Sequence, residues 1–155
     1  MKELRIGILG AGRIGKVHAE NVVTLAGAKL VRIADPYISD EMVQWATAHG
    51  AIPSKEAEDV FGDPEIDAVL ICSSSDTHAD FIVRAARAGK HIFCEKPIDY
   101  DTQRIRDTLK VVEECGVKLQ VGFMRRFDHN HRAAHDAIQN GAIGDPHILH
   151  ISSRD

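Results

Sequence analysis

The stretch GILGAGRIGKVHAEN, residues 7–21, decides the fold of this chain. An apolar run from Leu4 to Leu9 stops at a glycine, and apolar side chains then recur at helical spacing. The order is therefore strand, tight turn, helix. Gly10, Gly12 and Gly15 form the pattern G-x-G-x-x-G across the turn. Between a strand and a helix, this pattern predicts backbone N–H groups that face an anion.

Each glycine has its own expected role in such a turn. Gly10 permits the tight bend, Gly12 lets the backbone approach a pyrophosphate, and Gly15 lets the helix pack closely on the sheet. Asp35 ends the next strand at about the spacing expected for a carboxylate that binds a ribose diol. No cation occupies the next two positions, so we expect NAD rather than NADP. The alternative is that Asp35 caps a helix in a turn that binds no nucleotide.

The rest of the chain continues to alternate between strands and helices. We expect further strands over residues 29–34, 67–71, 91–94 and 118–123. Helices are expected to begin at Ser39 or Asp40, near Thr77, and at Asp101 or Thr102, with a brief helical segment capped by Ser54. This alternation predicts an α/β fold, in which a doubly wound parallel sheet is covered by helices on both faces.

The predicted Rossmann domain covers residues 1–123, and no long linker interrupts it. Residues 124–155 form a short region after this domain. Within it we expect a polar helix capped near Asp128 and a strand from Pro146 to Ser152 that has no obvious neighbour.

The composition of the chain argues against several classes of binding partner. The net charge of −4 argues against nucleic acid and membrane surfaces as partners, since phosphate binding needs a basic face. No apolar run approaches the length of a membrane span, and the N-terminus lacks the apolar stretch of a signal peptide, so a cytoplasmic location is expected. Cys72, Cys94 and Cys115 form no C-x-x-C pair and are interpreted as reduced, mostly buried thiols. A small molecule is the expected ligand.

A second informative stretch is HIFCEKPID, residues 91–99. Lys96 lies just beyond the end of a predicted strand, and ligands of open parallel sheets bind beyond the carboxyl ends of their strands. A lone lysine is most often a solvated surface residue. Pro97, however, restricts the backbone of the residue before it, so the ammonium is expected to be held on a stiff turn near the ligand.

Three motifs, GILGAGRIG, CEKPI and QVGFMRRFD, together resemble the glucose-fructose oxidoreductase, inositol dehydrogenase and rhizopine-catabolism (Gfo/Idh/MocA) family. The third motif is most similar to its inositol 2-dehydrogenases. The resemblance implies an NAD-dependent oxidation of a polyol, here myo-inositol to 2-keto-myo-inositol. It also implies that Lys96 is the catalytic lysine and binds the reacting hydroxyl. The family's helper histidine, with an aspartate four residues before it, would fall beyond Asp155.

The resemblance implies further site residues. Ser73, Ser74 and His78 match a loop along the ribose groups of the cofactor, and Glu95 matches a carboxylate near the nicotinamide ribose. Met124 matches a residue near the nicotinamide, and Arg125 matches one near the polyol. The positions between the second and third glycines, Arg13 and Ile14, complete the predicted cofactor-binding set. Alternatively, the serines only cap the next helix and Arg125 is solvated. The family resemblance also implies that residues 124–155 are the truncated start of a second, α+β domain for substrate binding and oligomerisation. A full-length protein is expected to be a homo-oligomer.

Two other chemistries are weaker interpretations. His131 and His135 lie four residues apart on a predicted helix and would share one face, but a metal site usually needs three or four sheltered ligands, so no metal is expected. Cys94 has no well-placed histidine base and is interpreted as a structural thiol. Two functional hypotheses remain. The chain is the cofactor-binding part of a polyol dehydrogenase, inactive without second-half catalytic residues, or it is a stand-alone NAD-binding module.

Overall fold

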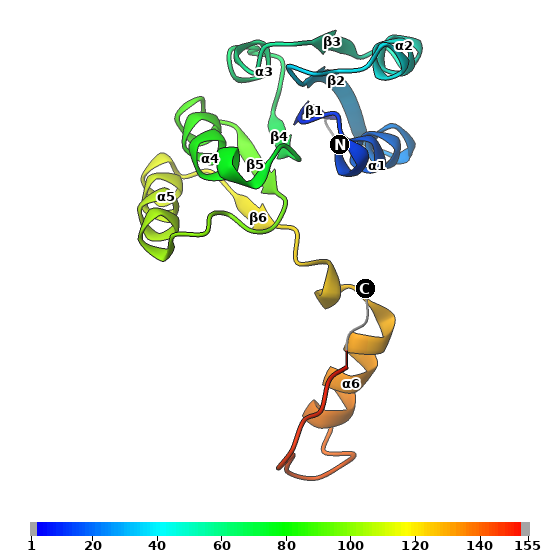
Figure 1. Cartoon of the computed structure of the whole chain (residues 1–155), viewed down its shortest axis with the longest axis vertical. Coiled ribbons are helices and arrows are strands. Elements are labelled where there is room, and N and C mark those ends of the chain that lie inside the picture. The colour runs from blue at the N-terminus through cyan, green and yellow to red at the C-terminus, as the bar shows by residue number, and fades with distance from the viewer. Residues whose placement is uncertain (1–2, 153–155) are drawn as a thin grey trace. The chain divides into compact units, whose positions relative to one another are not determined.

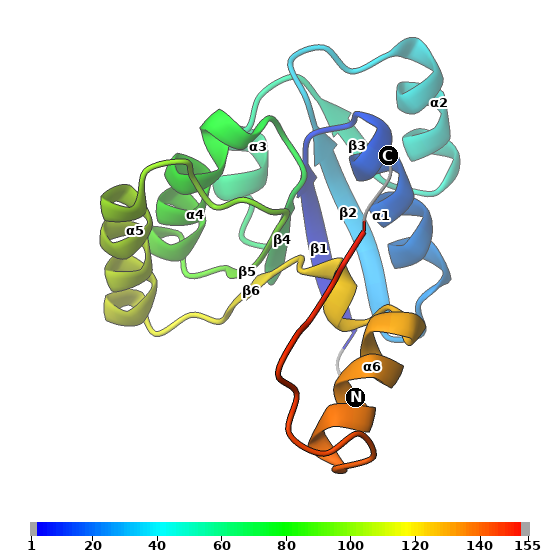
Figure 2. The same cartoon turned by 60° about the horizontal axis from the view of Figure 1, so that its bottom comes forward.

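The computed structural model describes residues 3–152. The chain divides into two compact units, residues 1–122 and 123–155, which are described separately. Figures 1 and 2 show the elements of both units along the chain.

The first unit is built on a parallel sheet of six strands in the order β3-β2-β1-β4-β5-β6. The strands are β1 (Leu4–Leu9), β2 (Ala28–Ala34), β3 (Ile52–Ser54), β4 (Ala68–Ile71), β5 (His91–Cys94) and β6 (Leu119–Val121). Chain order runs outward in one direction from β1 to β3 and in the other from β4 to β6. The strand order therefore reverses between β1 and β4, which is where open parallel sheets bind ligands.

Helices cover both faces of this sheet. They are α1 (Arg13–Thr24), α2 (Asp40–Ala48), α3 (Glu58–Phe61), α4 (His78–Arg87) and α5 (Thr102–Cys115), with a 3-10 turn, η1, over Ser75–Thr77. Helices α1 and α2 lie on one side, and α3, α4 and α5 lie on the other (Figure 2). Each side has its own apolar core: Ala19 and Met42 belong to one, and Val60 and Ile82 to the other. The fold is a doubly wound Rossmann fold.

Local sequence explains where the helices begin and end. Ser39 caps α2 by accepting a hydrogen bond from the Met42 N–H at 3.2 Å, and Asp101 caps α5 by accepting one from the Gln103 N–H at 2.8 Å. Helix α5 ends at Gly116, whose φ of 66° lies in the left-handed region that glycine adopts without strain.

The region after α2 differs from the sequence-based expectation. Ser54 does not cap a helix: it is the last residue of β3, an edge strand that the sequence analysis missed. Helix α3 instead begins after Ala57, with no side-chain cap. The strand is only three residues long and contains Pro53, so neither length nor periodicity identifies it.

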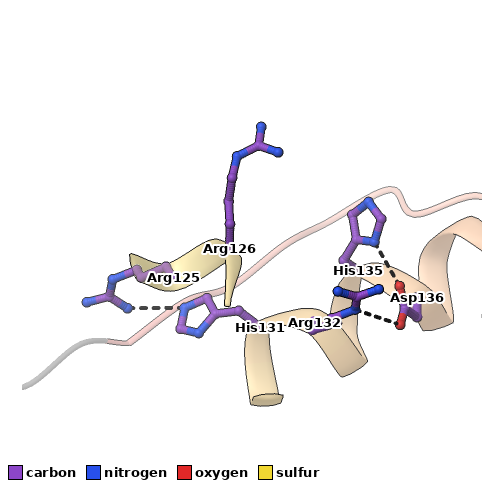
Figure 3. Close-up of a pocket in the computed structure, with 6 residues that line it drawn as sticks. All are labelled: Arg125, Arg126, His131, Arg132, His135 and Asp136. Carbon is purple, nitrogen blue, oxygen red and sulfur yellow. Dashed lines mark hydrogen bonds and ion pairs between the residues drawn. The ribbon is translucent and has the colours of Figure 1, made fainter. Parts of the chain in front are cut away.

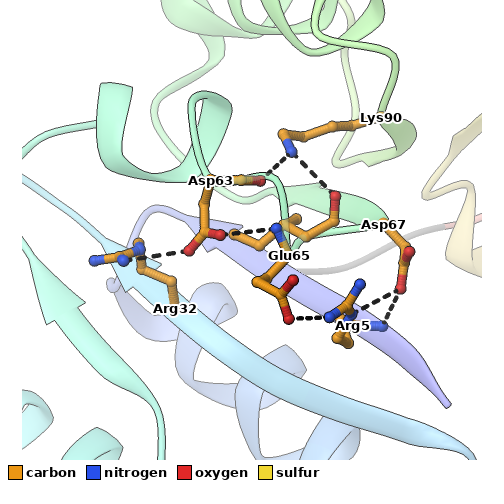
Figure 4. Close-up of polar contacts among 7 residues, drawn as sticks. Arg5, Arg32, Asp63, Glu65, Asp67 and Lys90 are labelled. Carbon is orange, nitrogen blue, oxygen red and sulfur yellow. Dashed lines mark hydrogen bonds and ion pairs between the residues drawn. The ribbon is translucent and has the colours of Figure 1, made fainter.

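The amino-terminal side of the sheet is held by charged groups around Asp63 (Figure 4). Its carboxylate accepts from the Glu65 N–H at 2.9 Å and from the Arg32 guanidinium at 3.2 Å. The buried Lys90 ammonium donates to the backbone carbonyls of Asp63 and Ile66, at 2.6 and 3.0 Å. This network lies away from the carboxyl ends of the strands. Its charged pairs therefore take no part in a site at those ends.

The second unit contains a 3-10 turn, η2 (Met124–Arg126), and helix α6 (His129–Gln139). Asp128 caps α6 by accepting from the N–H groups of Asn130 and His131. The predicted strand from Pro146 to Ser152 is not formed, because alternating sequence alone cannot form a strand without a neighbouring backbone to pair with. No side chain described in this unit is buried.

None of the helices within residues 3–152 combines the length and apolar character needed to cross a membrane.

Candidate functional site: the carboxyl-terminal rim of the sheet

The turn after β1 needs two of its glycines for the fold itself. Gly10 has a φ of 97°, and a Cβ there would lie 2.5 Å from the backbone nitrogen of Ser73. A Cβ on Gly15 would lie 2.0 Å from the carbonyl oxygen of Gly10. A side chain at Gly10 would therefore push the turn away from the loop after β4. A side chain at Gly15 would push the helix away from the turn. Both predicted roles describe real close approaches of backbone.

Gly12 differs, because a Cβ at this position would meet no atom of the described chain within 4 Å. Gly12 is also the residue before α1, and the helix starts without a side-chain cap. Arg13 and Ile14, the first residues of the helix, are exposed. The start of α1 therefore presents unsatisfied N–H groups and the positive end of a helix dipole to open space, which suits an anion such as a pyrophosphate.

Asp35 is fixed beside this turn by two backbone contacts. One carboxylate oxygen accepts from the Ala11 N–H at 2.7 Å, and the other accepts from the Tyr37 N–H at 2.8 Å. The carboxylate therefore has a set orientation at the end of β2, and each oxygen keeps a lone pair for a further donor. A vicinal diol is such a donor pair, whereas a phosphate would be repelled by the negative charge.

The loop after β4 is tied together by hydroxyl groups. Ser73 Oγ and Thr77 Oγ1 lie 2.6 Å apart, and Thr77 Oγ1 donates to the Ser74 carbonyl at 2.7 Å. Since that donation uses the Thr77 proton, Ser73 is the donor in the first contact. Ser74 precedes η1 and is exposed, without a side-chain cap contact.

His78 joins this loop to the turn after β5. Its side chain is 1% exposed. Nδ1 lies 2.7 Å from the Pro97 carbonyl oxygen, and Nε2 lies 3.0 Å from the Ser73 carbonyl oxygen. A neutral imidazole carries one N–H, so it donates to one carbonyl at a time, whereas an imidazolium donates to both. Because both nitrogens face protein carbonyls, His78 is placed to position two loops.

At the end of β5, Glu95 points toward α1. Its carboxylate accepts a hydrogen bond from His18 Nε2 at 2.9 Å, and the His18 ring meets the Phe93 ring edge-on at 5.1 Å between centroids. A Cβ on Gly122 would lie 2.9 Å from Phe93 and 3.1 Å from the Glu95 carboxylate, so glycine leaves room for this arrangement. The sequence analysis missed His18, because its partner lies 77 residues away along the chain.

Lys96 lies next on the same rim. It is exposed, and within residues 3–152 its ammonium has no hydrogen-bond or ion-pair partner. The peptide bond between Lys96 and Pro97 is cis, and the Pro97 carbonyl is held by His78. The free cation is thus carried on a turn whose next residue is anchored in the protein.

Two thiols lie under the rim. Cys72 and Cys94 are buried, whereas Cys115 is exposed. Burial, with a smaller effect of the Glu95 carboxylate, raises the pKa of Cys94 to about 12 and raises that of Cys72 as well. Both thiols therefore stay protonated and unreactive at neutral pH.

The other two predicted site residues, Met124 and Arg125, belong to the second unit. Arg125 donates to His131 Nε2 at 3.1 Å, and His131 Nδ1 donates to the Asp128 carboxylate at 3.0 Å. The contact with His131 is the main cause that lowers the pKa of Asp128 to about 2.

Figure 3 shows this basic surface, a pocket of about 530 Å³ within the second unit. Arg125 points toward His131, and Arg126 points away from both. Arg132 and His135 both contact Asp136, at 3.7 and 3.0 Å. Across the described residues 3–152, no three His, Cys, Asp or Glu side chains gather as potential metal ligands.

The first unit thus brings the glycine turn, Asp35, Ser73, Glu95 and Lys96 to one edge of a parallel sheet, next to the point where the strand order reverses. This fold and edge are typical of a dinucleotide-binding domain. Residues 4–123 match the Gfo/Idh/MocA family, described as an oxidoreductase family with an NAD-binding Rossmann fold. The chain belongs to this family.

Individual relatives agree with this assignment. The chain is 50% identical over 153 residues to inositol 2-dehydrogenase of Rhizobium meliloti (strain 1021), covering 98% of this chain and 46% of that protein. It is 39% identical over 153 residues to myo-inositol 2-dehydrogenase of Thermotoga maritima, covering 98% and 46%.

A solved structure is also similar. The crystal structure of scyllo-inositol dehydrogenase from Lactobacillus casei with bound NAD(H) and scyllo-inositol matches with a TM-score of 0.85 and 38% identity, covering 93% of this chain and 43% of that one. The chain spans about half the length of the curated relatives it matches.

Proposed function

We propose that this chain is the cofactor-binding part of an NAD-dependent dehydrogenase that oxidises myo-inositol to 2-keto-myo-inositol. The observation that carries the proposal is the Lys96 ammonium, which has no partner among residues 3–152 and lies on the same rim as the glycine turn and Asp35. The relatives named as inositol dehydrogenases support the choice of a ring polyol as substrate. In this proposal, residues 124–155 begin a domain for substrate binding and oligomerisation, and the enzyme is cytoplasmic.

The chain's own groups fit the cofactor in a definite order along the rim. The N–H groups at Gly12, Arg13 and Ile14 would hold the pyrophosphate, and Asp35 would bind the adenosine ribose diol. Ser73 and Ser74 would lie along the cofactor, and Glu95 near its second ribose. His78 is proposed to act on the cofactor through the two carbonyls it holds, because its own ring is buried.

NAD, when bound, supplies the hydride acceptor. Lys96 would donate a hydrogen bond to the reacting hydroxyl oxygen and stabilise the negative charge that develops on it as its proton leaves to a base supplied by the second half of the enzyme. That Lys96 has no partner in the described part of the chain matters, because a lysine already paired with a carboxylate would have to break that pair first. Arg125 is the proposed second contact to the polyol, and Met124 the proposed contact to the nicotinamide.

The cofactor proposal is tested by NADH fluorescence with Gly12→Val. Because the space beside Gly12 is open, the valine leaves the protein's own packing intact and occupies only the expected pyrophosphate position. We expect the melting temperature to stay within about two degrees and NADH affinity to fall at least about a hundredfold. Equal NADH affinity of the two proteins would reject the assignment of the turn.

The catalytic proposal is tested in a chimera that joins this chain to the second half of the R. meliloti relative. NADH formation from NAD and myo-inositol is followed by absorbance. We expect turnover in the chimera, loss of about a thousandfold with Lys96→Met, and NADH affinity within twofold of the parent. Full turnover by Lys96→Met would remove Lys96 from the mechanism.

The alternative is a stand-alone NAD-binding module. This alternative is supported by the first unit, which has two apolar cores of its own and carries the whole predicted cofactor set except Met124. NADH binding with no turnover in the chimera would favour the module. Oxidation of myo-inositol by the 155-residue chain alone would contradict the view that catalytic groups are missing from it.

A further inference from the structure

A pair of oppositely charged side chains lies beside the glycine turn, between α1 and α2. A small pocket of about 170 Å³ opens there, and Gly12, Lys16, Ser39 and Glu41 are among the residues that line it. The pocket adjoins Asp35, because Ala11, which also lines it, donates its N–H to the Asp35 carboxylate. It therefore borders the place where the proposed function puts the adenosine ribose.

Two cations, Arg13 and Lys16, line the pocket, and Lys16 is already neutralised by an ion pair. Lys16 Nζ lies 2.8 Å from Glu41 Oε1. The hydrogen bond between them raises the pKa of Lys16 and lowers the pKa of Glu41, so both groups are charged across the neutral range. The side chains are 42% and 79% exposed, and an ion pair this open to solvent is easily exchanged for another partner.

We infer that Glu41 is a specificity-determining residue that masks Lys16 and so excludes cofactors with a 2′-phosphate from this pocket. The inference rests on the proposed dinucleotide site. Asp35 alone was expected to reject NADP, since the two residues after it carry no cation. The structure places a cation, Lys16 of α1, beside this position. Glu41 of α2 supplies the carboxylate that pairs with it.

The start of α2 adds to the effect. Ser39 caps the helix, and Asp40 and Glu41 place two negative charges in its first turn. These charges oppose the positive end of the helix dipole, which would otherwise favour a phosphate. Neutralising Glu41 therefore removes one repulsive charge from the pocket, weakens the compensation of the dipole and frees the Lys16 ammonium.

The test leaves Asp35 in place, because this residue also holds the Ala11 and Tyr37 backbones. NADPH and NADH affinities are measured by fluorescence on the 155-residue chain. For Glu41→Gln we expect NADPH affinity to rise about tenfold and NADH affinity to change less than twofold. Adding Lys16→Met to Glu41→Gln should remove the gain.

Glu20→Gln is the matched control. The Glu20 carboxylate also raises the pKa of Lys16, from one turn further along α1, but Glu20 does not line the pocket. Its NADPH gain should stay below about twofold. Titration with 2′,5′-ADP against 5′-ADP isolates the 2′-phosphate from the nicotinamide half, and Glu41→Gln should favour the former.

Two results would overturn the inference while leaving the proposed function intact: unchanged NADPH affinity in Glu41→Gln, or the same gain with and without Lys16. The proposed function fails in a different way, by loss of NADH binding in the unsubstituted protein. Thermal unfolding of each variant confirms that the compared proteins are folded.

Discussion

The two units of this chain differ in what their apolar side chains contact. In residues 1–122, apolar side chains from the sheet and its helices form two buried cores. In residues 123–152, large apolar side chains remain exposed, including Phe127, Ile148 and Leu149. Helix α6 is well capped, and none of its described side chains is fully buried. Capping and periodicity are thus enough to define a helix, whereas a stable unit also requires a face to pack against.

Hydrogen exchange should show the largest difference between the units. Amides of β1 and β4, in the middle of the sheet, should exchange only on global unfolding. Amides of α6 should exchange at least about a hundredfold faster. Mass spectrometry of peptides from each segment measures this directly, and equal protection would show that the second unit has a core of its own.

Side-chain truncation sharpens the same comparison. Ile82 of α4 is 0% exposed, so Ile82→Ala should lower the free energy of unfolding by about 2–5 kcal/mol. Ile143 is 61% exposed, and Ile143→Ala should change it by less than about 0.5 kcal/mol. Urea denaturation followed by circular dichroism gives both values. A cost above about 1 kcal/mol for Ile143→Ala would contradict the assignment of the second unit as unpacked.

The smallest expected effect is a change in thermal stability at acidic pH. The Glu65 N–H, followed by the smaller effect of Arg32, keeps the pKa of Asp63 below its ordinary value. The ionised carboxylate therefore stabilises the first unit above about pH 4, and this stabilisation is lost as pH falls further and Asp63 is protonated. Melting temperatures measured between pH 6 and 3 should fall less steeply for Asp63→Asn than for the unsubstituted chain.

Asp128→Asn is the matched substitution in the second unit. The pKa of Asp128 is lowered to about 2, with the His131 contact as the first cause. Because none of the described α6 side chains is buried, we expect Asp128→Asn to reduce local helix content above about pH 4, where the Asp128 carboxylate is ionised, without moving the global melting temperature. A shift of that temperature equal to the shift from Asp63→Asn would link the two units in one cooperative transition.

The sequence predicted the parts of the fold that local patterns determine. Alternating strands and helices, the glycine turn and the caps at Asp101 and Asp128 all follow from neighbouring residues. The short edge strand β3 was missed, and the strand from Pro146 to Ser152 was wrong, because strand formation depends on a partner that sequence spacing does not show.

The residues of the candidate site were also predictable from the sequence only in part. Lys96 and Asp35 could be selected from the sequence, since each lies within two residues of the end of a strand. The contacts of His18 with Glu95 and of Lys16 with Glu41 could not, because they join residues 77 and 25 positions apart whose proximity depends on how α1 packs. The buried setting of His78 likewise depends on the Pro97 carbonyl in another loop.

The most direct test of the account is an NMR titration of the isotope-labelled 155-residue chain with NAD. The central claim predicts amide shift changes at Gly10 to Gly15, Asp35, Ser73 to Ser74 and Glu95 to Lys96, at the carboxyl ends of β1, β2, β4 and β5. Changes concentrated around Asp63 and Lys90, at the opposite end of the sheet, or absent from the glycine turn, would contradict it.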